Sequence, residues 1–242
     1  MQTKPTNLLY DGRFWRIFTL RLLGNYLILV SLFFIVKTFY DPFTSEIRYF
    51  VDNTLIRKEY IVEHEGFEPI PVNKPTKPTK SRFASFFNIE QTETIRPIDP
   101  EFSIVIPKIA ANARVIKNVN PADADDYLDK LQFGVAHAAG TYLPGQGGHV
   151  FLFAHSTDYV WNIGTYNAVF YLLYKLNVGD EVNIFHEGRR HVYLVTEKKV
   201  VEPTDVQYLT AKTESEFLTL QTCWPPGTTL KRLLVFAKPK VE

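Results

Sequence analysis

The chain has almost no cysteine, and this scarcity excludes several kinds of protein. Its 242 residues include one cysteine, Cys223, so an intramolecular disulfide is impossible and the paired CxxC ligands of a zinc site are missing. The six histidines show no HExxH spacing, and there is no GxxxxGK[ST] or GxGxxG loop to hold phosphates. The formal net charge of +1 lacks the basic excess of a nucleic-acid-binding protein. We therefore expect no metal, no cofactor and no nucleic-acid partner.

Long apolar runs are also scarce, and the exception lies near the N-terminus. Residues 22–40 read LLGNYLILVSLFFIVKTFY, which is long enough to cross a hydrocarbon core of about 30 Å as a helix. Arg13, Arg16 and Arg21 precede this run and favour a cytoplasmic N-terminus. No small-residue cleavage site follows it. We predict a single-pass signal anchor in the cell membrane, behind a cytoplasmic tail at 1–21; the alternatives are a helix lying on the membrane surface and a core helix.

Residues 41–100 have the composition of a stalk. Their middle reads PIPVNKPTKPTK, and proline alternating with lysine and threonine favours an extended, polyproline-like chain. The phenylalanine-rich stretch within 81–99 leaves open whether part of the stalk folds as a lid over the domain that follows.

From residue 101 to residue 242 the sequence changes to short β-rich runs. Glycine- and proline-rich turns such as PGQGG, VGDE and PPGTT separate them. Many short strands with few helices predict a single β-barrel or sandwich of about 140 residues. The predicted strands are SIVIPKI (103–109), HVFLFA (149–154), EVNIF (181–185), HVYLVTEKKVV (191–201), FLTLQT (217–222) and RLLVFAK (232–238).

Two helical patches interrupt the predicted strands. The apolar residues of YNAVFYLLYKL (166–176) recur at three- and four-residue spacing. PADADDYLDKL (121–131) opens with acidic residues that suit a helix N-terminus. This explains the acidic run better than a calcium site does, so no metal is predicted there.

The single cysteine lies in TLQTCWPPGTTLKR (219–232) and is either a buried small hydrophobe or a reactive thiol. If residues 217–238 form a hairpin with its loop at 224–231, Cys223 and Arg232 are directly opposite and share one face. An arginine beside a thiol favours the thiolate and can hold an oxyanion. The alternative is that Arg232 is an exposed strand end.

A thiol nucleophile also needs a base, which directs attention to the histidines. His155 is best placed, because it follows the apolar strand HVFLFA and begins a polar turn. His137, in the loop GVAHAAGT, is the second choice. The others have simpler interpretations: His149 as a solvent-facing edge residue, His186 and His191 at a solvated hairpin tip, and His64 in the stalk.

These motifs resemble the sortase family, the membrane-anchored cysteine transpeptidases of bacterial cell surfaces. TLQTC at 219–223 matches the TLxTC signature, and Arg232 and His155 match the arginine and histidine that accompany it. The resemblance covers roughly residues 101–238 in the right order. One departure is Ala154, where a glycine commonly precedes the histidine. Further matches are IPKI (106–109), GTYLPGQGGHVFLFAH (140–155) and VFYLLYKLNVGDEV (169–182).

The resemblance implies a mainly β fold, a closed antiparallel barrel of about eight strands with short helices, for a catalytic domain at 101–242. It also implies a cysteine transpeptidase that cleaves an LPxTG-like signal of exported proteins. Cys223 would form the thioester, His155 would act as acid and base, Arg232 would stabilise the oxyanion, and Thr222 would support it. The acceptor would be an amine, either a peptidoglycan cross-bridge or a pilin lysine.

Three alternatives remain open at this stage. A cysteine protease with water as acceptor would use the same residues. A catalytically silent sortase-like binding module is expected to lose Cys223, His155 or Arg232, and all three are present. An adhesin or pilus subunit is expected to carry its own sorting signal, which this chain lacks. The sortase subclass is not assigned.

Overall fold

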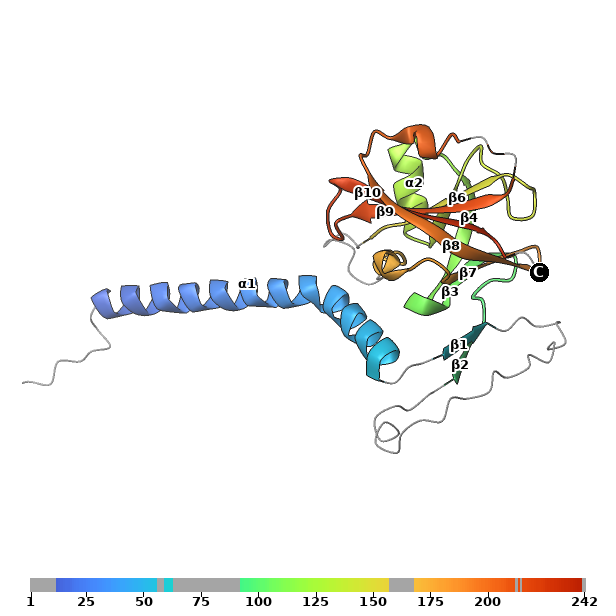
Figure 1. Ribbon diagram of the computed structural model, residues 1–242. Helices are drawn as coiled ribbons and strands as arrows, with labels where there is room; N and C mark the ends of the chain where they lie inside the picture. The colour runs from blue at the N-terminus through green and yellow to red at the C-terminus, as the bar shows by residue number, and fades with distance from the viewer. Residues whose placement is uncertain are drawn as a thin grey trace, which may run out of the picture. The chain divides into compact units, whose positions relative to one another are not determined.

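The computed structural model describes residues 12–55, 59–62, 92–156, 168–211, 213 and 215–240 (Figure 1). The chain divides into two compact units between Thr44 and Ser45. Most of helix α1 (Gly12–Phe50) belongs to the first unit, and the β-barrel belongs to the second. Residues 81–91 of the segment 81–99, for which a lid was left open, and His64 lie outside the described residues.

Helix α1 begins with a stretch that is long and apolar enough to cross a membrane. This stretch, Gly12–Tyr40, has a mean hydropathy of 1.9, and none of its most apolar window is buried within the protein. The predicted span at 22–40 lies inside it. The apolar stretch starts earlier because Phe14, Trp15 and Phe18 extend it toward the N-terminus. The helix is therefore compatible with a membrane anchor, while the predicted domain borders stay predictions.

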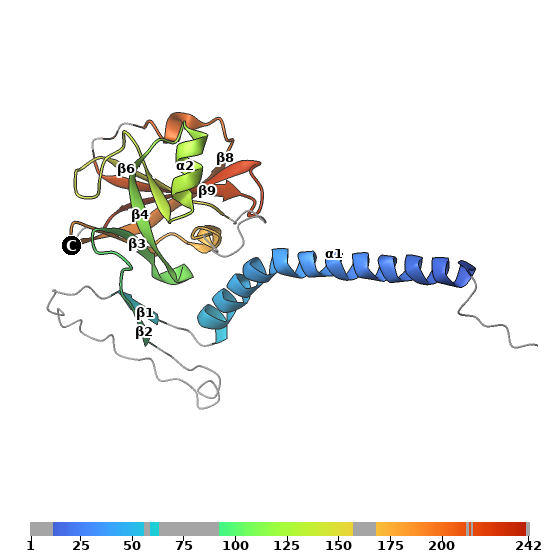
Figure 2. The same ribbon diagram turned by 180° about the vertical axis from the view of Figure 1, so that it is seen from behind.

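The second unit contains a closed barrel of eight strands, as the resemblance implied. Six neighbouring pairs are antiparallel, and two, β4–β5 and β6–β9, are parallel. Parallel neighbours need a crossover connection, and helix α2 (Ala124–Leu131) supplies one between β4 and β5 (Figure 2). The strands are β3 (Phe102–Ile106), β4 (Ala111–Val119), β5 (Val135–Ala138), β6 (His149–Phe153), β7 (Glu181–His186), β8 (Arg189–Val201), β9 (Phe217–Trp224) and β10 (Lys231–Pro239), in the spatial order β10-β8-β7-β3-β4-β5-β6-β9.

The two predicted helices have opposite outcomes. Helix α2 is confirmed, and the Asp123 side chain caps its N-terminus by accepting hydrogen bonds from the backbone N–H groups of Asp125 and Asp126. The prediction for 166–176 is wrong over its described part, 168–176, which forms turns and the short 3-10 helix η5 (Leu173–Lys175). Phe170, Leu173 and Leu176 are fully buried there, so burial against the barrel accounts for the apolar spacing without an α-helix.

Two strands outside the barrel cover part of its outer surface. β1 (Glu59–Val62) and β2 (Thr92–Ile95) form a parallel two-stranded sheet. Val62 packs with Val105 of β3 and Phe185 of β7, and Ile95 lies against the same cluster. Val105 therefore faces this outer cluster, while its neighbours Ile104 and Ile106 face the barrel core. Burial on both sides explains why all five residues of β3 are buried, with no alternation of buried and exposed positions.

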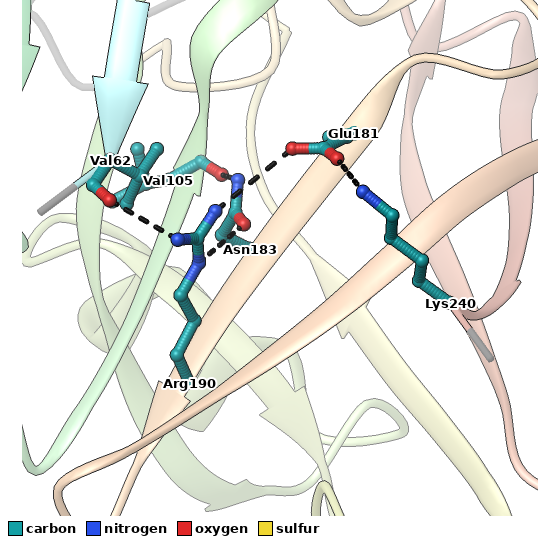
Figure 3. A network of polar contacts seen from close by, with 6 residues as sticks. All are labelled: Val62, Val105, Glu181, Asn183, Arg190 and Lys240. Atoms are coloured by element: carbon teal, nitrogen blue, oxygen red, sulfur yellow. Dashed lines mark hydrogen bonds and ion pairs between the residues drawn. The ribbon is translucent and has the colours of Figure 1, made fainter. Parts of the chain in front are cut away.

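A polar network fixes the same sheet to the barrel (Figure 3). Arg190 of β8 donates from Nη1 to the carbonyl of Val62 at 3.1 Å and from Nε to Oδ1 of the buried Asn183 at 2.9 Å. Glu181 lies 4.0 Å from Arg190 and accepts a 2.8 Å hydrogen bond from Lys240. The segment at 59–62, which the sequence placed in the stalk, is thus attached to the barrel by both apolar and polar contacts.

Candidate functional site

Cys223 and Arg232 lie directly opposite each other on neighbouring strands. Cys223 is near the end of β9 and Arg232 near the start of β10, and the two residues are register partners. This confirms the register predicted from the hairpin. Side chains of directly opposed residues point to the same face of a sheet. The guanidinium is held by two 3.1 Å hydrogen bonds from Nη1, one to the carbonyl of Thr229 in the hairpin loop and one to that of Lys231 at the start of β10.

His155 follows the end of β6, the strand that pairs in parallel with β9. The register joins Phe153 to Gln221, and the N–H of Ala154 donates to the Gln221 carbonyl at 3.1 Å. Continuing both strands by two residues places His155 next to Cys223 at the same barrel edge. His155 is half-buried and lines the same cavity as Cys223 and Arg232.

Thr222 joins the two strand ends that carry the histidine and the cysteine. It is buried, and its hydroxyl donates a 3.0 Å hydrogen bond to the carbonyl of Ala154, the residue before His155. A threonine hydroxyl has a single proton to donate. That proton is directed at Ala154, so the hydroxyl holds the backbone of the two strands together.

We expect Thr222→Val to lower the free energy of unfolding by about 1–3 kcal/mol, because it leaves the buried Ala154 carbonyl without this donor. Thr222→Ser keeps the hydroxyl and is the matched control; it should lose about 0.8 kcal/mol for the missing methyl group. Denaturant unfolding of both variants measures the difference. If the valine variant is as stable as the wild-type protein, the hydrogen bond from Thr222 to Ala154 does not contribute to stability.

A cavity of about 230 Å³ opens beside Cys223. Its wall is mixed in polarity, and its apolar part comes mainly from helix α2, strand β6 and the connection between β8 and β9. Glu202 and Asp205 add carboxylates to this wall. The sequence did not single out any of these lining residues, because they come from separate segments that only the fold brings together. The apolar residues are Leu128, Leu131, Phe151, Phe153, Val206 and Leu209.

The environment of Cys223 keeps it a thiol at neutral pH. Burial raises the pKa of the Cys223 thiol above its ordinary value of 9.0, and the positive charge of Arg232 opposes this rise only in part. The thiolate is the nucleophilic form of cysteine. Only a small fraction of Cys223 is therefore thiolate in the absence of substrate, and the positive charge of Arg232 increases that fraction.

The alkylation rate of Cys223 by iodoacetamide should rise about tenfold per pH unit between pH 6 and 8, because the thiolate fraction grows tenfold per unit below the pKa. The chain has one cysteine, so all incorporated label reports on this thiol. Mass spectrometry of timed samples gives the rate constant. A rate that levels off below pH 8 would mean that the thiol pKa is lowered, contrary to its burial.

The other described histidines are mostly buried for structural reasons. His137, the second choice from the sequence, is fully buried; its Nδ1 accepts from the Asn118 N–H, which leaves Nε2 to donate to the Tyr142 carbonyl at 3.0 Å. The interpretation of His149 as a solvent-facing residue is wrong: it is buried and stacked on Phe217, and burial lowers its pKa to about 4. The interpretation of His186 as part of a solvated tip is also wrong, because this residue is buried.

The geometry defines a class of protein: a closed β-barrel with a single thiol opposite an arginine, at the edge of a cavity of mixed polarity. A family model described as a sortase domain matches residues 104–240, more than half of the chain. The chain therefore belongs to the sortase family. No curated protein matches it.

Solved sortase structures resemble this chain over its barrel. Sortase C1 of GBS pilus island 1 has 30% identity and a TM-score of 0.50; the match covers 58% of this chain and 64% of that one. Sortase C-1 from Actinomyces oris has 30% identity and a TM-score of 0.49, over 60% of this chain and 76% of that one. Sortase A from Corynebacterium diphtheriae, a lid mutant, has 28% identity and a TM-score of 0.48, over 60% and 72%. This chain thus spans less than two thirds of the first of these relatives, and the matches carry different subclass letters.

Proposed function

We propose that this protein is a membrane-anchored cysteine transpeptidase that cleaves an LPxTG-like sorting signal and transfers the carboxyl end of the cleaved protein to an amine. The acceptor is a peptidoglycan cross-bridge or a pilin lysine. The proposal rests mainly on one observation. Cys223 and Arg232 are register partners at a cavity that His155 also lines, in a chain that belongs to the sortase family.

In the first half of the reaction, the Cys223 thiolate attacks the carbonyl carbon of the Thr-Gly bond. The carbonyl π electrons move to oxygen, and Arg232 stabilises the resulting oxyanion. When the oxyanion collapses, the C–N bond breaks and protonated His155 gives its proton to the leaving amine. The products are a thioester on Cys223 and the released C-terminal fragment of the substrate.

In the second half, neutral His155 removes a proton from the incoming amine as it attacks the thioester carbonyl. A new amide bond forms, the C–S bond breaks, and the Cys223 thiolate leaves. Each half-reaction returns the site to the protonation state that the next one needs. Thr222 supports the site by joining the strand ends through Ala154, since its hydroxyl proton is directed at that carbonyl.

The anchor suits an enzyme of exported proteins. An N-terminal apolar helix with Arg13, Arg16 and Arg21 on one flank favours a cytoplasmic N-terminus and an extracellular barrel. The apolar part of the cavity wall suits the leucine and proline of an LPxTG-like signal, because both side chains gain from leaving water.

The test is mass spectrometry of the full chain in detergent, incubated with an LPxTG-type peptide library with and without triglycine. A thioester adduct on Cys223 that passes to triglycine supports a transpeptidase and reports the preferred sequence. An adduct that reacts only with water favours the second candidate, a cysteine protease. Folded protein that forms no adduct with any peptide would overturn both and leave a silent binding module.

A further inference from the structure

The end of helix α1 that enters the barrel unit has a row of exposed apolar side chains. Phe43, Ile47 and Phe50 are 65%, 47% and 56% exposed. They are four and three residues apart, so they lie along one stripe of the helix. The row directly follows the membrane-spanning stretch Gly12–Tyr40, from which Pro42 separates it. Ile47 and Phe50 belong to the barrel unit, and Phe43 precedes them on the same helix.

A different stripe of the same helix end is fixed to the barrel. The Glu46 carboxylate accepts a hydrogen bond from the Tyr174 hydroxyl and lies 3.1 Å from Nζ of Lys175. The same Nζ lies 5.1 Å from the centre of the Tyr49 ring, a cation–π contact. One turn further, Nδ2 of Asn53 donates to the Lys108 carbonyl at 3.5 Å.

These contacts are within one compact unit, which includes Ser45 and all that follows. Burial, followed by the hydrogen bond to Glu46, raises the pKa of Tyr174 to about 12, in keeping with a hydroxyl held in a covered contact. Glu46, Tyr49 and Asn53 therefore make the helix end a part of the barrel unit, in which Ile47 and Phe50 stay exposed.

We propose that this stripe of helix α1, Phe43, Ile47 and Phe50, inserts into the interface between the headgroups and acyl chains of the membrane. A helix with one apolar stripe lies in the interface with that stripe about 5–10 Å deep. Because the stripe directly follows the apolar stretch of the same helix, we infer that the bilayer covers it. The inference rests on the proposed anchoring by α1 and goes beyond it.

The single cysteine makes a direct test possible. Cys223→Ala gives a full chain without cysteine, into which one cysteine is introduced at Phe43, Ile47 or Phe50, labelled with a nitroxide and reconstituted into phosphatidylcholine–phosphatidylglycerol vesicles. Collision rates with oxygen, which is concentrated in lipid, and with a water-soluble nickel chelate then report the surroundings of each label. Thr44→Cys and Arg48→Cys are matched controls on the same helix end, and Leu29→Cys is the control for the spanning stretch.

We expect labels at the three stripe positions to show an oxygen-to-nickel ratio several-fold higher than labels at Thr44 and Arg48, and lower than the label at Leu29. Labels at Ile47 and Arg48 that are equally accessible to the nickel chelate would overturn the inference. If the label at Leu29 then still reports lipid, the proposed anchoring by α1 is unaffected. Poor access to both reagents at the stripe would overturn it in favour of contact with a second copy of the chain. A Leu29 label without a lipid signal would overturn the anchor and the inference together. The labelled side chains are exposed, so these substitutions spare the core.

Discussion

Cys223→Ala is expected to abolish the thioester adduct with every LPxTG-type peptide, because it removes the atom that forms the bond. The expected loss in the rate of peptide cleavage is at least about 10⁶-fold, the size typical of deleting a covalent nucleophile. Mass spectrometry of the intact chain detects the adduct, and chromatography of the cleaved peptide gives the residual rate. Cleavage by the alanine variant at a rate near that of the wild-type protein would contradict the proposed mechanism.

The alanine variant should remain folded, which separates a loss of chemistry from a loss of structure. Cys223 is half-buried at the edge of a cavity, so removal of its sulfur leaves less of a void than a deletion in the core would. We expect the free energy of unfolding to change by less than about 1 kcal/mol. Denaturant unfolding of both proteins in the same detergent provides the comparison.

Arg232→Gln is expected to lower the acylation rate by about 10²–10³-fold, the cost of removing one donor to an oxyanion. Two effects act in the same direction. The oxyanion loses its cation, and the pKa of the Cys223 thiol rises further because the charge that opposed burial is gone. Single-turnover acylation with a peptide substrate measures the first effect, and iodoacetamide labelling at several pH values measures the second.

Two further substitutions make the arginine test specific. Arg232→Lys retains the charge but not the planar fork, so we expect it to recover thiol reactivity with iodoacetamide while acylation stays impaired. Lys238→Gln makes the same change of charge at an exposed position on the same strand, β10, and should have little effect. If the glutamine variants at 232 and 238 acylate equally fast, Arg232 is only an exposed strand end.

The local sequence pattern was sufficient to predict that Cys223 and Arg232 lie together, because one hairpin contains both residues. The Pro-Pro-Gly loop between Cys223 and Arg232 favoured a register that sets the two residues opposite each other, and the structure has that register. His155 could be selected as a strand-end histidine, although its position beside β9 depends on a parallel pairing between segments 68 residues apart. The roles of these three residues stay predictions until the variants are measured.

The sequence was less informative where residues depend on distant partners. Strand β4 carries Asn112, Arg114 and Lys117 on a barrel face that is partly open, so its pattern was not recognised as a strand. Strand β5 has four residues, too few to show a period. Glu46 contacts Tyr174, which is 128 residues away in the chain, and no local sequence pattern around either residue predicts that contact. Long-range packing, not local preference, decides each of these cases.

The attachment of β1 to the barrel has a consequence for a chain that a protease cuts between β1 and β2. β1 and β2 are side by side although the chain between them runs from residue 63 to residue 91. A protease that cuts within that interval would break the only covalent path from the anchor to the barrel. The two fragments would still be joined by β1 pairing with β2, by Arg190 on the Val62 carbonyl and by Glu46 on Tyr174 and Lys175. Separation of the barrel from the α1 fragment would therefore need the dissociation of these contacts as well as the cut.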